Sequence, residues 1–325
     1  MAYLTYQFPN EEVKILKGSW REKSFEDLPE NCFFITDFIK EKSFYFIEEE
    51  EVSAFSNADL FFNKEDDVFI ANEKAYLNGL QYFIDGFEMF GIEKAIFSRI
   101  KLVEKEEASR MIEVFQRLAK VYKSQALVYL VSDEKFGTWI GATPETLLSG
   151  NEKVMKSMAL AGTKRSEETQ WTTKEREEQQ YVVDFVKNRI EAQFSGDLYV
   201  SSAETVKKGS VYHLQTNFEF PLAKEKWNDL MQSLHPTPAV CGTPRDLAQN
   251  YILTNEPHKR EFYTGLIGLK SVNELKVYVN LRCMQVLEDN FALYLGGGIT
   301  LASDIANELQ ETEDKSETLL SVIFG

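Results

Sequence analysis

Apolar residues recur along this chain in two rhythms, one typical of strands and one typical of helices, and the pattern sharpens from residue 92 onward. Short apolar or alternating runs bounded by turn residues predict β-strands. Two longer stretches with apolar positions three and four apart predict helices, at residues 104–123 and 174–194. The predicted strands are residues 31–36, 43–47, 95–102, 126–132, 138–142, 154–161, 198–204, 277–286 and 291–295.

Most predicted strands follow one another directly, which favours antiparallel sheets with helices packed outside. The sequence therefore predicts an α+β fold. A doubly wound dinucleotide-binding fold is not expected, because Leu301 stands where the glycine fingerprint after a strand requires Gly or Ala. With 325 residues, the chain can bury the core of one large domain or of two closely joined halves.

The charge balance narrows the possible partners. A net charge of -16 repels nucleic acid and anionic membrane surfaces, so we expect neither as a partner. An anionic substrate must then be held by local cations or by a metal. The three cysteines are unclustered and odd in number, which predicts neither a disulfide framework nor a zinc site. Without a signal-like start or a membrane-length apolar run, a cytoplasmic protein is expected.

The C-terminal segment carries the strongest chemical signal. An apolar strand at residues 291–295 leads into a triple glycine, and Ser303-Asp304 then predicts the start of a helix. On that helix Glu308, Glu311 and Lys315 share one face. Bare backbone amides beside two acids and a lysine indicate a site for an anion together with a divalent metal.

Two charged residues have both a structural and a functional interpretation. Glu178 falls on the apolar face of the 174–194 helix, where it either reaches the solvent at the boundary or binds a metal. Lys94 precedes an apolar strand, where it is either a solvated flank or a desolvated general base.

The same choice applies to three further residues. Glu145 follows a predicted strand, as part of a turn or as a general acid, and His213 is a core histidine or a pocket residue. Arg282 lies in an apolar strand, which leaves a ligand carboxylate and a buried ion pair as its possible partners. The proline-rich loop at residues 235–244 is either a rigid pocket wall or simple punctuation. Acyl hydrolysis, nucleotide hydrolysis and zinc chemistry lack the motifs that they require.

Taken together, these segments resemble the chorismate-utilising enzymes, the group of isochorismate, anthranilate, aminodeoxychorismate and salicylate synthases. The resemblance covers residues 76–325, leaving residues 1–75 as a weakly matched N-terminal part of one large domain. The motifs occur in the family's order: KAIFSR, GATPETLL, LAGTKR, KEREEQ, VYHLQT, LHPTPAVCGTP, REFYTGLIG, NLRC, GGGI and NELQETEDK. The family fold implied by this resemblance is two antiparallel sheets packed in a sandwich, with helices outside.

Within the group the chain looks most like the isochorismate synthases. Lys94 stands where those enzymes carry the base that activates water, and where anthranilate synthases typically have glutamine. Ala161 stands where aminodeoxychorismate synthases typically have a nucleophilic lysine. The form of the proline-rich loop is also typical of isochorismate synthases.

The resemblance implies roles for matched residues. Lys94 is the implied base for water attacking C2 of chorismate, and Glu145 is the implied acid for the departing C4 hydroxyl. Arg99 is a candidate for lowering the pKa of Lys94. Glu178 and Glu311 would bind Mg²⁺, with Glu308 acting through water. The implied substrate-binding residues are Thr163, His213, Tyr263, Arg282, Gly297, Gly298 and Lys315.

The sequence departs from the family pattern at Gln179, often histidine, and at Glu175, often aspartate, which puts metal affinity in doubt. Salicylate synthase, anthranilate synthase and a catalytically silent relative are the competing functions. The expected protein is a monomer without a glutaminase subunit. Menaquinone biosynthesis is preferred over siderophore biosynthesis, because no siderophore module is fused to the chain.

Overall fold

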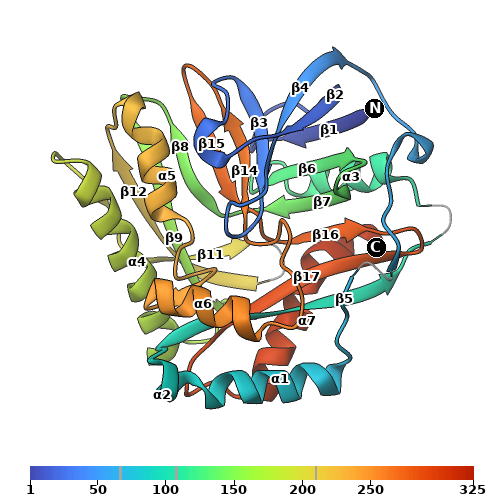
Figure 1. Ribbon diagram of the computed structural model, residues 1–325. Helices are drawn as coiled ribbons and strands as arrows, with labels where there is room; N and C mark the ends of the chain where they lie inside the picture. The colour runs from blue at the N-terminus through green and yellow to red at the C-terminus, as the bar shows by residue number, and fades with distance from the viewer. Residues whose placement is uncertain (66–67, 107–108, 209–210) are drawn as a thin grey trace.

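The computed structural model describes residues 1–65, 68–106, 109–208 and 211–325. Within these ranges 17 strands join into one folded antiparallel β-sheet, with α-helices on its outer faces (Figure 1). The sheet has two halves that face each other, and the strand pairings give the order of strands in each.

The first half is organised around a long central strand pair. β5 and β17 lie side by side in continuous register from Glu104 opposite Asn290 to Ala95 opposite Ile299. Across this half the order is β13 (Gly242–Thr243), β5 (Lys94–Glu104), β17 (Asn290–Ile299), β16 (Cys283–Val286), β7 (Gly137–Thr143), β6 (Leu127–Asp133) and β1 (Ala2–Gln7).

The second half continues from the N-terminal hairpin. Its order is β2 (Lys14–Glu22), β4 (Ser43–Glu51), β3 (Cys32–Thr36), β14 (Leu266–Lys270), β15 (Leu275–Val279), β8 (Thr146–Gly150), β9 (Met155–Lys164) and β12 (Val211–Phe220). Both β10 (Tyr199–Val200) and β11 (Glu204–Lys208) pair with the outer edge of β12.

The expected sandwich is confirmed, with one addition. β1 pairs with β6 on one side and with β2 on the other, and β2 pairs with β4, so the hydrogen bonding runs continuously from one half to the other. Between the halves lies an aromatic-rich core that includes Trp20, Phe33, Tyr129, Trp139 and Tyr294. Burial of large apolar side chains is the dominant force that holds the halves together.

Helices cover the outer faces of both halves (Figure 1). α4 (Thr173–Gln193) and α5 (Trp227–Leu234) pack on the second half, whereas α3 (Met111–Val121) and α7 (Ile305–Ile323) pack on the first. α1 (Glu73–Asp85), α2 (Phe87–Phe90) and α6 (Arg245–Asn255) pack around the start of β5. Short 3₁₀ turns occupy Phe25–Asp27, Asn57–Asp59 and Lys224–Lys226.

Several sequence-based predictions need correction. Residues 104–123 are not one helix, because β5 extends to Glu104 and α3 begins at Met111; residues 107–108 lie outside the described part. Residues 198–204 are not one strand, since β10 ends at Val200 and β11 begins at Glu204. The predicted strand 277–286 is broken between Val279 and Cys283. The other predicted strands and the 174–194 helix are present, with ends shifted by a few residues.

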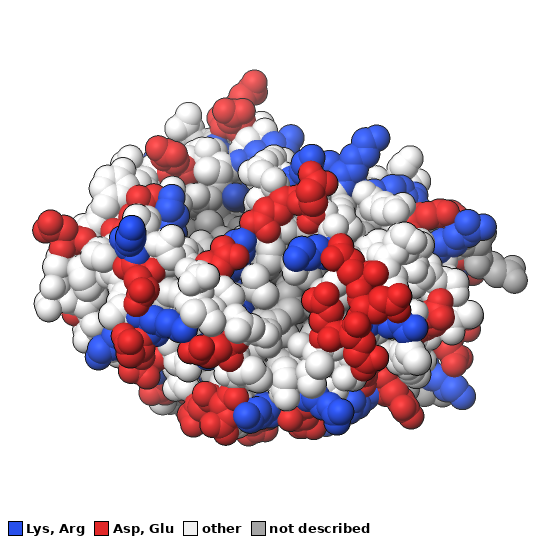
Figure 2. Space-filling view, turned by 90° about the horizontal axis from the view of Figure 1, so that it is seen from above, with Lys and Arg blue, Asp and Glu red and all other residues white. Residues whose placement is uncertain are grey.

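The N-terminal residues are an integral part of the sandwich. β1 to β4 lie within residues 1–75 and bridge the two halves. Within the described residues, no helix combines the length and apolar character needed to cross a membrane. On the face shown in Figure 2, acidic and basic side chains are interspersed and form no continuous basic patch.

Candidate active site

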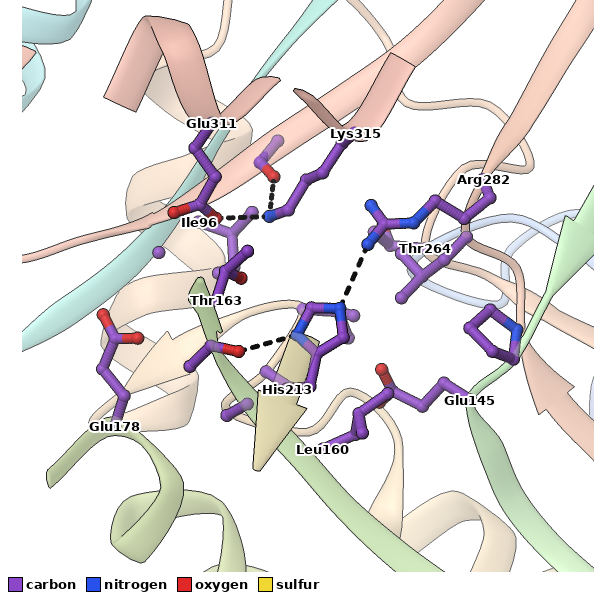
Figure 3. A pocket seen from close by; sticks show the side chains of 18 of the residues that line it. Ile96, Glu145, Leu160, Thr163, Glu178, His213, Thr264, Arg282, Glu311 and Lys315 are labelled. Atoms are coloured by element: carbon purple, nitrogen blue, oxygen red, sulfur yellow. Dashed lines mark hydrogen bonds and ion pairs between the residues drawn. The ribbon is translucent and has the colours of Figure 1, made fainter. Parts of the chain in front are cut away.

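One pocket collects most of the residues that the sequence had singled out. It opens beside β5 and β17 and is closed by β9, β12, α4, α7 and the proline-rich loop. Its lining consists of Lys94, Ile96, Pro144, Glu145, Leu160, Ala161, Gly162, Thr163, Glu178, His213, Ala239, Val240, Tyr263, Thr264, Leu281, Arg282, Gly296, Gly298, Glu311 and Lys315. Figure 3 shows Glu178 and Glu311 at one side, Glu145 and Arg282 at the other, and His213 between them.

The triple glycine forms the end of β17 itself and leaves room on both faces of that strand. A Cβ atom on Gly298 would lie 2.9 Å from Cε of Lys94 and 3.4 Å from Oε1 of Glu178. Residue 297 points to the opposite face, as alternate residues of a strand do. The missing side chains thus admit Lys94 and Glu178 beside Gly298, and Glu308 and Glu311 beside Gly297.

The acids on the outer face come from α7. A Cβ atom on Gly297 would lie 3.2 Å from Oε2 of Glu308 and 3.8 Å from Oε1 of Glu311. Asp304 caps this helix by accepting a hydrogen bond from the backbone amide of Asn307, as the sequence predicted. The cap fixes the start of α7 and therefore the position of both glutamates over Gly297.

Glu308 has one satisfied and one unsatisfied oxygen. Its Oε1 lies 2.8 Å from Nζ of Lys174, at the start of α4. Its Oε2 is buried and has no hydrogen-bond partner among the described residues. Sequence reasoning missed Lys174, which sits one turn before Glu178 on the same helix. A buried carboxylate oxygen without a partner is costly, and a cation at this place would remove the cost.

Glu178 is also buried, and burial raises its pKa above the usual value, with a further contribution from the nearby charge of Glu311; the Lys94 ammonium opposes the rise. Among the described residues, no three His, Cys, Asp or Glu side chains converge closely enough to enclose a metal ion by themselves. The carboxylates Glu178, Glu308 and Glu311 instead surround the glycine segment from two helices. Such an open set fits Mg²⁺, which keeps waters and binds substrate oxygens beside one or two carboxylates.

Lys315 joins the acids to the strand backbone. Its Nζ lies 2.6 Å from Oε1 of Glu311 and donates to the carbonyl of Gly296 at 2.7 Å. Burial would raise the pKa of Glu311, but the Lys315 ammonium outweighs it and the pKa is lowered. Glu311 is therefore ionised at neutral pH and Lys315 has a fixed position at the pocket.

Glu145 lies at the opposite side in a different environment. It follows β7 in the Pro144-Glu145 step before β8, and its side chain is buried. Burial raises its pKa from 4.5 to about 7, against the opposing charges of Arg282 and Lys94. At neutral pH much of this carboxyl is protonated, which is the state that a general acid requires.

Arg282 differs from its prediction in both backbone and partner. It lies in the break between β15 and β16 with φ of 47°, not inside a strand. Its guanidinium forms no ion pair among the described residues and instead donates to Nε2 of His213 at 3.3 Å. A left-handed arginine that faces a pocket without a carboxylate partner keeps its remaining donors available for a ligand anion.

Lys94 is buried at the start of β5, which rules out the interpretation as a solvated flank. Arg99 does not line the pocket; it pairs with Glu313 and donates to Oγ1 of Thr312 at 2.8 Å. The odd spacing from residue 94 to 99 turns Arg99 to the other face of the strand, toward α7. The structure shows no contact between Arg99 and Lys94 among the side-chain hydrogen bonds and ion pairs of Arg99, which are with Glu313 and Thr312.

Two of the predicted site residues, Gly297 and Glu308, lie just behind the lining rather than in it. The pocket also contains residues to which the sequence analysis assigned no role, such as Leu160, Thr264 and Leu281. Apolar pocket walls look like any core position in a single sequence. Ala239 and Val240 confirm the interpretation of the proline-rich loop as a pocket wall.

The two departures from the family pattern have structural roles. Nε2 of Gln179 donates to the carbonyl of Ala159 at 3.1 Å, which ties α4 to β9. Glu175 accepts from the backbone amide of Thr172 and closes the capping box of α4. Neither of these hydrogen bonds involves Glu178, Glu308 or Glu311, the three carboxylates around the glycine segment.

Comparisons with known proteins identify the family of this chain. Residues 46–324 match the sequence profile described as "Chorismate binding enzyme". Isochorismate synthase DhbC of Bacillus subtilis (strain 168) is 30% identical over 266 residues, which are 75% of this chain and 66% of that protein. The chain spans 34% to 66% of the length of eight curated relatives that it matches.

Two solved structures share the fold. The putative 2,3-dihydroxybenzoate-specific isochorismate synthase DhbC of Bacillus anthracis gives a TM-score of 0.82 at 23% identity, covering 99% of this chain and 96% of that chain. MenF, described as the menaquinone-specific isochorismate synthase of Escherichia coli, gives a TM-score of 0.79 at 18% identity, covering 99% and 89%.

Proposed function

This chain belongs to the family of chorismate binding enzymes, and from that premise we propose that it is a Mg²⁺-dependent isochorismate synthase. One observation carries the proposal. A buried lysine, Lys94, and a buried carboxyl with a pKa raised to about 7, Glu145, line the same pocket as the cations Arg282 and Lys315. A base and an acid in one pocket can add water to a substrate and remove a hydroxyl from it, and the two cations can bind a dianion.

The proposed reaction divides between the two sides of the pocket. Lys94 takes a proton from the water that attacks C2 of chorismate, and the ring double bonds shift. Glu145 gives its proton to the C4 hydroxyl, which leaves as water. The overall change is an isomerisation, because one water enters and one leaves. Lys94 must be unprotonated for this step.

The cations would bind the carboxylates of the substrate. Arg282 presents a planar donor group that suits a carboxylate. Lys315 is held in place by its bonds to Glu311 and to the carbonyl of Gly296. His213 orients Arg282, while Thr163 and Tyr263 complete the wall. Local cations are needed because the protein as a whole is strongly acidic.

Glu178 and Glu311 would hold Mg²⁺, and Glu308 would contribute its unpartnered oxygen directly or through a water. Bound at this place, the ion would neutralise charge on the ring carboxylate as the hydroxyl leaves. The orphaned Oε2 of Glu308 beside the bare Gly297 supports this assignment.

The test is turnover of chorismate by the purified protein with and without Mg²⁺, with products separated by chromatography. Isochorismate that forms only with Mg²⁺ and needs no ammonia is the expected result. Salicylate together with pyruvate, or a product that requires ammonia, would assign a sister activity. No turnover and no binding of chorismate would overturn the enzyme assignment.

For the destination of the product we propose menaquinone biosynthesis, with the enzyme acting in the cytoplasm as a monomer. The names of its relatives include both menaquinone-specific and vibriobactin-specific isochorismate synthases. Deletion of the gene followed by growth with added menaquinone or added iron would separate the two uses. Rescue by iron alone would contradict the menaquinone proposal.

A further inference from the structure

We propose that a second cavity, next to the candidate active site along the same two strands, binds a small aromatic acid that carries a ring hydroxyl. The proposal goes beyond the chorismate reaction and concerns a cavity of about 640 Å³. This volume is in the range of small-molecule sites. Its lining does not overlap with that of the first pocket.

The two cavities share one face of β5 and β17. Along β5, Lys94 and Ile96 line the first cavity and Ile100 lines the second. Along β17, Gly298 and Gly296 line the first and Tyr294 lines the second. These residues alternate along their strands and so point to one side. Ser98, opposite Gly296 in the register, lies between the two cavities.

The walls of the second cavity suit a planar ring. Trp139 packs against Tyr294 with ring centroids 5.0 Å apart, and against Phe262 at 5.4 Å. Flat aromatic surfaces of this kind stack on an aromatic ligand at little cost in conformational entropy. The aromatic lining residues are Phe44, Phe69, Phe136, Trp139, Phe262 and Tyr294.

Buried polar groups in this cavity lack protein partners. Gln285 is 5% exposed and Tyr294 is 2% exposed. Among the described residues, neither the Gln285 amide nor the Tyr294 hydroxyl forms a hydrogen bond, and both side chains line the cavity. Neither group is among the fully enclosed polar atoms that lack a partner, so both are accessible from the cavity to a bound water or ligand.

His258 adds an acceptor whose tautomer follows from its neighbours. The Ser98 hydroxyl donates to Oε1 of Glu256 at 2.8 Å, because this carboxylate can only accept. Burial opposes ionisation of Glu256, but the Arg260 guanidinium outweighs it and lowers the pKa of the carboxyl. Ser98 therefore accepts from Nε2–H of His258 at 3.0 Å, and Nδ1 of that ring is a bare acceptor.

These groups define the chemistry of the ligand. A ring hydroxyl can donate to Nδ1 of His258, and a carboxylate can accept from the Tyr294 hydroxyl and the Gln285 amide. Lys42, Lys135 and Lys259 line the same cavity with Glu22 and Glu261. Lys42 pairs with Glu261 and Lys135 with Asp133, whereas Lys259 forms no ion pair among the described residues and can bind a ligand carboxylate.

A buried ion pair lies in the wall between the cavities. Arg260 binds Glu256 at 2.7 Å and donates to the carbonyls of Ile96 and Val240, which both line the first cavity. A ligand that contacts His258 therefore presses on Ser98 and Glu256, and through Arg260 on the first pocket. We expect occupancy of the second cavity to change the KM for chorismate.

The experiment is calorimetric titration of the full protein with 3-hydroxybenzoate, and with benzoate as the analogue that lacks the hydroxyl. It needs neither Mg²⁺ nor chorismate, so its result is independent of the proposed reaction. We expect saturable binding of 3-hydroxybenzoate and weaker binding of benzoate. Tyr294→Phe and Gln285→Leu should each weaken binding about tenfold, the equivalent of one lost hydrogen bond.

Matched variants separate the two cavities. Tyr6→Phe removes the hydroxyl of another buried core tyrosine and should leave binding unchanged. Arg282→Ala alters the first cavity and not the second, and should also leave binding unchanged. Thermal melting shows whether each variant is folded, and Tyr294→Phe alone suffices if Gln285→Leu does not fold.

Two results would overturn the proposal. One is the absence of a binding heat with 3-hydroxybenzoate at millimolar concentration. The other is binding that Arg282→Ala abolishes and Tyr294→Phe leaves intact, which would place the ligand in the first cavity. A change in the KM for chorismate with added 3-hydroxybenzoate, lost in Tyr294→Phe, would support the coupling.

Discussion

Nη2 of Arg282 lies 3.3 Å from Nε2 of His213, and Nδ1 of the same ring lies 2.6 Å from the carbonyl of Gly162. Because a guanidinium can only donate, Nε2 is the acceptor and the ring proton is on Nδ1. Burial, reinforced by the charge of Arg282, lowers the pKa of His213 from 6.5 to about 3. The imidazole is therefore neutral at every working pH and serves to orient Arg282.

His213→Ala should raise the KM for chorismate about tenfold, because Arg282 loses an acceptor that fixes its position. The pH dependence of kcat should be unchanged, since this histidine does not titrate between pH 5 and 9 in the folded protein. Steady-state kinetics across that range check both points. An acidic limb near pH 6 that disappears in the variant would show that His213 transfers protons.

Lys94→Ala should lower kcat by a factor of roughly 10² to 10⁴, the usual contribution of a positioned general base. Chorismate binding should persist, because Arg282 and Lys315 are intact. Turnover and calorimetric binding are measured side by side. Lys101→Ala, which removes a lysine from the same strand that pairs with Glu313 at 2.6 Å, should retain turnover. Equal losses in the two variants would argue against Lys94 as the base.

Glu145 should produce an alkaline limb in the rate profile. The proposed acid must be protonated, and its pKa is raised to about 7, so kcat should fall as the pH rises through that value. Glu145→Gln should be poorly active at every pH and should show no such limb. Rate measurements from pH 5 to 9 provide the check. A wild-type rate that climbs through pH 7 would assign the opposite role to this carboxyl.

The same shift affects stability. Since the folded pKa of Glu145 lies above 4.5, its stabilising contribution is complete below pH 4.5 and is lost as the pH rises through about 7. Between pH 4 and pH 8, the free energy of unfolding of Glu145→Gln should therefore rise by about 3 kcal/mol relative to that of the wild type. Urea unfolding at the two pH values measures this difference. A gain that is equal at both would mean that the buried carboxyl carries no penalty at pH 8.

Lys174→Gln should strengthen Mg²⁺ binding about tenfold, because a cation 2.8 Å from Oε1 of Glu308 competes with the metal for that carboxylate. The metal-free variant should melt at a lower temperature and recover when Mg²⁺ is added. Calorimetry without chorismate gives the affinity directly. Lys187→Gln changes an exposed lysine of the same helix and is the matched control. Weaker Mg²⁺ binding in Lys174→Gln would show that the lysine supports the site.

The sequence predicted those strands and helices in which apolar residues recur at the regular spacing of a strand or a helix. β5, β6, β7 and α4 are buried on one or both faces, and apolar residues mark those faces. The triple glycine could not be predicted as a strand in this way, because glycine has no side chain that could show an apolar pattern and has a low β propensity. It is nevertheless the paired end of β17, held by its register with β5.

The site was predicted mostly from the resemblance, and structural reasoning decided between the remaining alternatives. The apolar run around Arg282 concealed a break, because a left-handed residue has no signature unless it is glycine or asparagine. The partnership of Lys174 with Glu308 joins residues 134 positions apart, which no local pattern records. The role of the N-terminal strands was missed because it also depends on distant pairing: β1 is held by its hydrogen bonds to β6.

α7 brings Glu311 and Lys315 to the pocket and Glu308 just behind its lining, while β5 brings Lys94 from more than 200 residues earlier. During synthesis, most of the pocket wall is therefore made before the acids and the lysine that complete it. A chain that is still short of Lys315 can form much of the sandwich but lacks the side chains for metal and substrate. Ligand affinity thus reports on completion of the chain, and a proteolytic cut before α7 should remove it in one step.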